Sequence, residues 1–104
     1  MPIIIQTNLK KAKVKAQTNA AKNDPKFCLL ITCNGLSGTA YATYLVQGYG
    51  IGNARFHVTP LHTGGNYTFE ISENESAIII DSKSGQWDCS VFAVYGLLPN
   101  IEKI

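Results

Sequence analysis

Six short β-strand patterns, each followed by a turn cluster, constrain this chain more than any other feature of its sequence. Clusters rich in glycine, asparagine or serine separate the patterns, and the spacing leaves no room for helices between them. Such spacing is typical of an antiparallel sandwich or a small barrel. We expect an all-β fold, an antiparallel β-sandwich of six or seven short strands with an N-terminal arm. The patterns cover residues 27–33, 39–47, 54–61, 67–72, 77–81 and 87–95.

Alternation of apolar and polar residues within these patterns predicts which side chains face the core. Residues 27–33 carry apolar side chains at every odd position, as a half-buried strand does. Residues 77–80 are apolar throughout, which is typical of a central strand covered on both faces. The candidate core residues are Leu29, Ile31, Leu45, Phe56, Val58, Phe69, Ile71, Ile79, Val91 and Ala93.

The first 26 residues differ from the rest in charge. They hold six lysines and one aspartate, a net charge of +5, whereas residues 27–104 carry −3. Residues 11–16 alternate with period two like an edge strand, but Leu9, Ala12, Ala16 and Ala20 also fit one face of a helix. We favour an extended arm or a short edge strand that ends before Pro25. The predicted division is a basic N-terminal arm, 1–26, and a β-sandwich domain, 27–104, with residues 3–5 anchoring the arm on the body or on a neighbouring subunit.

The three cysteines, Cys28, Cys33 and Cys89, are an odd number without a CxxC motif. Cys28 and Cys33 lie five positions apart on one strand, so they face opposite sides of the sheet and cannot pair with each other. We expect free thiols in a reducing compartment. No signal peptide and no run of about 18 apolar residues is visible, so we expect synthesis in a cytoplasm and no membrane insertion.

The sequence offers little for catalysis or metal binding. His57 and His62 would point to opposite faces of one strand unless Pro60 interrupts it, so we expect no shared metal ion. The glycine-rich stretch 48–52 lacks the following helix that a phosphate-binding loop needs, which favours a bulged or wide hairpin loop. We therefore expect no enzyme, no metal and no cofactor. The alternative is a small nucleic-acid-binding module that uses the lysines of the arm, or an uncharacterised small enzyme that uses a cysteine.

One group of residues beside the glycine-rich stretch suits ligand binding. An aromatic ring next to hydrogen-bonding side chains can stack on a sugar and bind its hydroxyl groups. The same side chains also serve ordinary strand and turn packing. The candidate receptor-binding residues are Tyr49, Asn53, Arg55 and His57.

Residues 44–62 run from a strand through the glycine-rich turn into a strand that carries Arg55 and His57, and Gly64-Gly65-Asn66 follows. With the apolar strand 77–80 and a final strand 89–95 before Gly96, this pattern resembles small β-sandwich domains of bacteriophage tail fibres and related receptor-binding proteins. The resemblance implies a phage or prophage virion structural protein of the tail, fibre or baseplate type, with a host-receptor or glycan-binding role. It also implies a homo-oligomer, first a trimer, that contacts other tail or virion proteins. The low content of charged residues, 15%, independently favours assembly because few charges protect the sheet edges.

Overall fold

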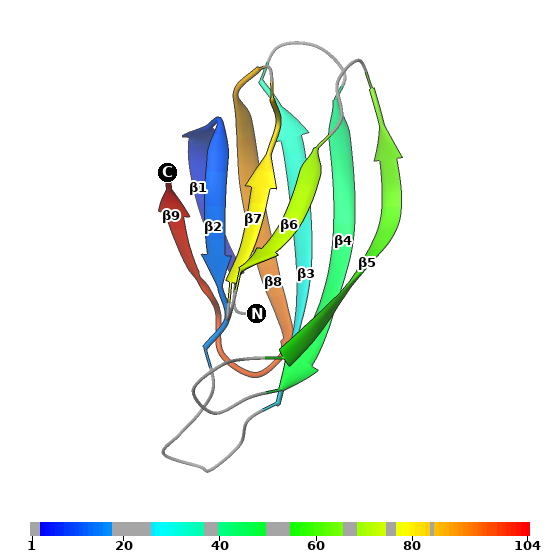
Figure 1. Cartoon of the computed structure of the whole chain (residues 1–104), viewed down its shortest axis with the longest axis vertical. Coiled ribbons are helices and arrows are strands. Elements are labelled where there is room, and N and C mark those ends of the chain that lie inside the picture. Colours follow the sequence, from blue (N-terminus) through cyan, green and yellow to red (C-terminus); the bar gives the residue numbers. More distant parts are fainter. Residues whose placement is uncertain are drawn as a thin grey trace.

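The computed structural model describes residues 3–17, 26–36, 40–49, 55–65, 69–74, 77–83 and 85–104, and these form nine β-strands in two antiparallel sheets (Figure 1). One sheet has the order β1-β8-β3-β4-β5 and the other β6-β7-β2-β9. The all-β class is confirmed, and the two layers are consistent with a β-sandwich. The strands are β1 Ile3–Leu9, β2 Lys11–Lys15, β3 Lys26–Gly35, β4 Tyr41–Tyr49, β5 Arg55–Gly64, β6 Glu70–Asn74, β7 Ala77–Asp81, β8 Trp87–Tyr95 and β9 Asn100–Lys103.

The predicted number of six or seven strands is wrong, because the described residues already form nine. The six sequence patterns correspond to β3 through β8, and the additional strands are β1, β2 and β9. β1 pairs with β8, while β2 lies between β7 and β9. The lysine-rich segment therefore follows its period-two pattern, with Ala12 and Val14 facing inward and the lysines outward. The N-terminal residues 3–15 thus contribute β1 to one sheet and β2 to the other.

The core lies between the two sheets and draws on both. Leu9, Ala12 and Val14 from the first two strands are buried in it together with Trp87 and Ile80. Eight of the ten predicted core residues lie in this cluster or pack against it: Leu29, Ile31, Val91, Ala93, Phe56, Val58, Phe69 and Ile71.

The prediction that Leu45 and Ile79 belong to the core is wrong. Leu45 alternates with the buried Tyr44 and Val46, so it lies on the outer face of its sheet. Ile79 lies between Ile78 and Ile80, both buried, and is half-buried on the outer face of β7. The continuous apolar run therefore belongs to a strand with one face on the core and one outward, not to a strand covered on both faces.

The chain passes from one sheet to the other between β1 and β2. Asn8 has a φ of 57°, and its backbone N–H donates to Asp88 Oδ1 at 3.0 Å. The carbonyl oxygen of Lys10 then accepts hydrogen bonds from Trp87 Nε1 at 3.0 Å and from the Ser82 N–H at 3.2 Å. Strands of both sheets are thereby attached to a single peptide group at this corner.

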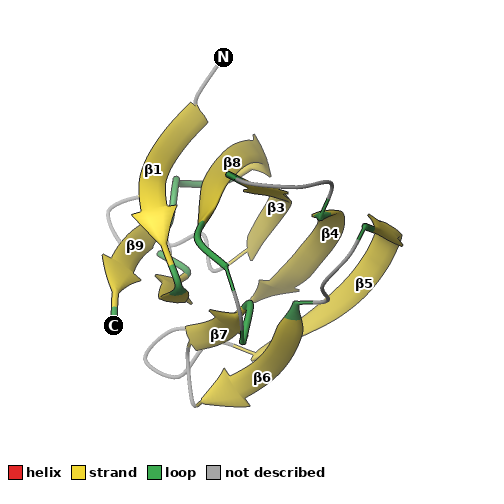
Figure 2. Ribbon diagram, turned by 90° about the horizontal axis from the view of Figure 1, so that it is seen from above, coloured by secondary structure: helices red, strands yellow, loops and turns green. Residues whose placement is uncertain are grey.

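The two sheets differ by one strand, and the view along the strands shows the consequence (Figure 2). β5 lies at the edge of the five-stranded sheet, and its inward-facing Phe56 and Val58 remain only partly buried. A cavity of about 420 Å³ opens there, between β4 and β5 on one side and Phe69 and Ile71 on the other. The sandwich is open at this side.

Candidate functional site

Two of the residues predicted to bind a receptor, Tyr49 and His57, lie on the outer face of the five-stranded sheet. Tyr49 ends β4 and pairs with Arg55, and Gln47, two residues earlier on the same face, pairs with His57. Tyr49 and His57 are exposed. The backbone of Arg55 belongs to β5, whereas its side chain lies outside the described part of the structure, as does Asn53 altogether. The structure thus brings Tyr49, the Arg55 backbone and His57 to one end of one face.

The sequence analysis missed two neighbours of Tyr49 on this face, Lys26 and Tyr95. Lys26 opens β3 and pairs directly with Tyr49. Tyr95 ends β8 and pairs with Cys28 on the other side of β3. The register of β8 against β3 shifts just before Tyr95, so Tyr95 leaves the inward face that Ala93 and Val91 occupy and turns outward. Simple alternation along the strand predicts that Tyr95 faces the core, so the sequence did not identify it as a surface residue.

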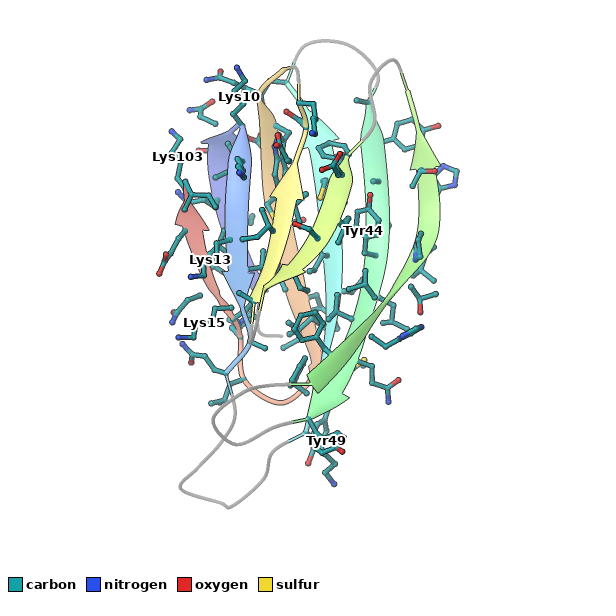
Figure 3. All side chains as sticks on the ribbon, in the orientation of Figure 1. Lys10, Lys13, Lys15, Tyr44, Tyr49 and Lys103 are labelled. Atoms are coloured by element: carbon teal, nitrogen blue, oxygen red, sulfur yellow. The ribbon has the colours of Figure 1, made fainter. Side chains whose placement is uncertain are left out.

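These residues line an open hollow of about 600 Å³, here called the tyrosine hollow. Tyr49 and Tyr95 stand on opposite sides of β3, with about 12 Å between their backbone positions from ordinary strand spacing. Figure 3 shows Tyr49 at the end of the sandwich, where β4 finishes. Among the described residues, the lining consists of Lys26, Phe27, Cys28, Gln47, Gly48, Tyr49 and Tyr95.

The tyrosine hollow combines apolar rings with hydrogen-bonding groups. The Tyr49 side chain is 55% exposed and Tyr95 is 47% exposed, so both rings present a face or an edge to solvent. The Lys26 ammonium lies 5.5 Å from the centre of the Tyr95 ring, which is a cation–π distance and restrains both side chains. Gln47 adds an amide that can both donate and accept hydrogen bonds. This arrangement can bind a neutral or anionic polar ligand with flat apolar faces.

The prediction that His57 and His62 point to opposite faces of the strand is wrong. His57 pairs with Gln47 and His62 with Thr43, and both β4 partners lie on the outer face. A bulge at Leu61 inserts one residue between them, so both histidines point outward. Their β4 partners are four residues apart, which separates them by about 13 Å and prevents a shared metal ion. His62 instead stacks on Tyr41 at a ring distance of 5.1 Å, at the opposite end of the face from Tyr49.

The lysines of β2 form a row on the outer face of the other sheet. Lys11, Lys13 and Lys15 alternate with buried Ala12 and Val14, and Figure 3 shows Lys13 and Lys15 along this strand. Acidic residues interrupt the row, because Lys11 pairs across the sheet with Asp81 and Lys13 with Glu102. The row is separate from the tyrosine hollow.

The buried ionisable groups lie away from the tyrosine hollow. Burial, with a smaller effect of Cys33, raises the pKa of the Tyr44 hydroxyl above its usual value. A hydrogen bond with the Cys89 thiol, followed by burial, raises the pKa of the Cys33 thiol far above its usual value. Both groups are therefore neutral at physiological pH in the folded chain, and neither lines the tyrosine hollow.

Within the described part of the chain, no three histidine, cysteine, aspartate or glutamate side chains come together as metal ligands. Nor do the described residues include a helix of the length and apolarity needed to span a membrane. The chain matches no protein-family model, no curated protein and no solved structure at a significant level. The geometry of the tyrosine hollow is therefore the starting point for a functional proposal.

Proposed function

We propose that this protein is a non-catalytic β-sandwich binding module whose tyrosine hollow binds a cell-surface glycan. The observation that carries the proposal is the pair of half-exposed tyrosines on either side of β3, next to the Lys26 ammonium and the Gln47 amide. Sugar rings offer apolar C–H faces that stack on tyrosine and hydroxyl groups that hydrogen-bond to amides and ammonium groups. Because the hollow is open, a chain of sugar units can cross it without threading.

We also propose the biological setting in which this binding takes place. The resemblance to phage tail-fibre domains supports a virion or prophage tail protein that is made in the host cytoplasm and assembles as a homo-oligomer, with a trimer as the first form to test. The exposed edges support assembly independently. β1, β5, β6 and β9 each lie at the end of a sheet, where their outer backbone groups can pair with another chain.

A glycan array followed by titration calorimetry with the best ligand tests the binding function. Tyr49→Ala and Tyr95→Ala should each weaken binding about five- to tenfold, since an aromatic contact contributes roughly 1 kcal/mol beyond its buried area. Tyr41→Ala is the matched control. Tyr41 is an exposed tyrosine on the same strand and face, at the far end, where its ring stacks on His62 instead. The control should bind like the wild type.

An array and a cell-binding assay without any signal would contradict the glycan proposal. An equal loss of binding in all three tyrosine variants would move the site out of the tyrosine hollow. For the assembly, light scattering at tens of micromolar should give a multiple of the 11.3 kDa chain mass. A monomeric mass at that concentration would contradict the oligomer.

A further inference from the structure

The register of the central strands brings two cysteines together. Cys33 on β3 and Cys89 on β8 are direct cross-strand partners, although they lie 56 positions apart in the sequence. Both are fully buried on the inner face, whereas Cys28 is half-buried on the outer face of β3. All three are free thiols in this structure. The sequence did not predict this pair, because the spacing of cysteines shows only how those on the same strand are oriented.

The hydrogen-bond pattern shows which kind of cross-strand pair this is. The Leu36 N–H donates to the Gln86 carbonyl at 2.9 Å, so these two residues form a hydrogen-bonded pair at the end of the β3–β8 ladder. Hydrogen-bonded and non-hydrogen-bonded pairs alternate along antiparallel strands. Cys33 and Cys89 are three positions further along the same uninterrupted register, and are therefore a non-hydrogen-bonded pair.

The other side of β3 gives the same result. The Gly35 N–H donates to the Ala40 carbonyl of the adjoining β3–β4 connection at 2.8 Å. Two positions earlier, Cys33 pairs with Ala42, so its backbone groups point toward β4 and away from β8. The side of Cys33 that faces β8 is therefore free of ladder hydrogen bonds, and the two side chains approach each other closely.

This geometry suits a disulfide. Non-hydrogen-bonded pairs have their Cα atoms about 4.5 Å apart, inside the range of roughly 4.4–6.8 Å that disulfides require. Cys33 and Cys89 are also both buried on the inner face, so the two side chains project from adjacent strands to the same side of the sheet. We propose that Cys33 and Cys89 are a disulfide-forming site, which a low-molecular-weight disulfide such as glutathione disulfide oxidises to a bond between β3 and β8.

The reaction is an ordinary thiol–disulfide exchange. One cysteine thiolate attacks a sulfur of glutathione disulfide, which forms a mixed disulfide and releases one glutathione thiolate. The second cysteine thiolate then attacks the protein sulfur of that mixed disulfide, which closes the Cys33–Cys89 bond and releases the second glutathione. The two cysteines lose two protons and two electrons, and one glutathione disulfide becomes two glutathione thiols.

Burial decides when this exchange occurs. Both sulfur atoms are inaccessible in the folded sandwich, and the exchange needs a thiolate and an open path to it. The mixed disulfide with glutathione therefore forms during folding, before the sheets close over Cys33 and Cys89, and the protein bond closes as β3 and β8 pair. The same burial afterwards protects the bond from reductants. Cys28, at the edge of the tyrosine hollow, forms at most a mixed disulfide with glutathione.

Two variants with two cysteines each give a matched test. Cys28→Ser retains Cys33 and Cys89, while Cys33→Ser retains Cys28 and Cys89 on opposite faces of the sheet. Each chain is unfolded in urea and refolded into a buffer of reduced and oxidised glutathione. Remaining thiols are then alkylated with N-ethylmaleimide under denaturing conditions, and the intact mass is measured.

The Cys28→Ser chain should lack two hydrogens and carry neither alkyl label nor glutathione. Its urea midpoint should rise above that of the reduced chain and return to the reduced value when dithiothreitol is present during unfolding. The Cys33→Ser chain should carry labels or glutathione on both cysteines. If a variant fails to refold, peptide mapping of the three-cysteine chain after the same treatment should identify a linked Cys33–Cys89 peptide.

Two labels or two glutathione adducts on Cys28→Ser would overturn the proposal. So would an oxidised Cys28→Ser chain with a lower urea midpoint than its reduced form, or a map of the three-cysteine chain that shows a different linked pair. The measurement involves no glycan, so it stands or falls separately from the proposed binding function.

Discussion

The replacement of Leu9 by alanine tests how strongly the lysine-rich N-terminal segment is integrated into the fold. Leu9 ends β1, is fully buried, and pairs in register with Trp87. Leucine-to-alanine changes in well-packed cores cost about 2–5 kcal/mol, because the transfer free energy is lost and a cavity remains. We expect about 3 kcal/mol for Leu9→Ala. For a domain of this size the melting temperature should then fall by about 12 °C or more.

The control comes from the same strand. Ile5 lies on the outer face of β1 with 60% of its surface exposed, so Ile5→Ala should change the free energy of unfolding by no more than about 0.5 kcal/mol. Both variants can be followed by urea unfolding with tryptophan fluorescence, because Trp87 is the single tryptophan of the chain and is fully buried. The protein concentration is kept where light scattering gives one species.

A clear result would refute this reasoning. If Leu9→Ala lost less than about 1 kcal/mol, or no more than Ile5→Ala, the segment would be a peripheral arm of the kind that its charge suggests, and the burial of Leu9 would carry no energy. A large loss in Leu9→Ala alone would show that the sandwich depends on its first strand.

Two further predictions concern single positions. Gly96 has a φ of 89°, and a Cβ there would lie 2.8 Å from the Lys26 carbonyl oxygen, so Gly96→Ala should cost about 1–3 kcal/mol by urea unfolding. Gly64→Ala is its control and should cost less, because a Cβ at Gly64 would meet only the ring of the exposed Tyr41. The raised pKa of Tyr44 predicts stability that is fully present below about pH 10 and is lost as pH rises further, because the unfolded chain then releases the proton more readily. In urea titrations at pH 9–11, Tyr44→Phe should flatten this decline of stability with pH, and Tyr49→Phe is the exposed control. An unchanged dependence of stability on pH in Tyr44→Phe would count against Tyr44 as the group responsible.

The sequence was most informative where alternation was strong. The six patterns found β3 through β8, because each combines a buried face with a turn signal. β2 was ambiguous since its lysines and alanine bury little surface. Only the partners on β7, β8 and β9 make β1 and β2 strands of the two sheets. Local propensity cannot show such long-range pairing.

The site was only partly predictable for a related reason. Tyr49 and His57 lie on one face as expected, because β4 and β5 pair regularly in that region. Tyr95 and His62 were misplaced since a single extra residue in β8 and in β5 reverses the alternation. No residue type marks the bulge in β8, whereas Pro60 directly precedes the bulge in β5. The Cys33–Cys89 pair depends on the register between strands that are distant in the sequence.

The pairing of the first two strands also determines the order in which the chain can fold during synthesis. Every partner of β1 and β2 lies between residues 77 and 103, in the last third of the chain. At about 5–20 residues per second, the N-terminal segment leaves the ribosome roughly 4–16 s before its partners exist. Its lysines are well suited to that interval, since positive charges at alternate positions discourage unpaired strands from associating with other chains. The sheets can close only after residue 103 has been synthesised, and the chain then folds through contacts that are mostly long-range, which favours slow folding.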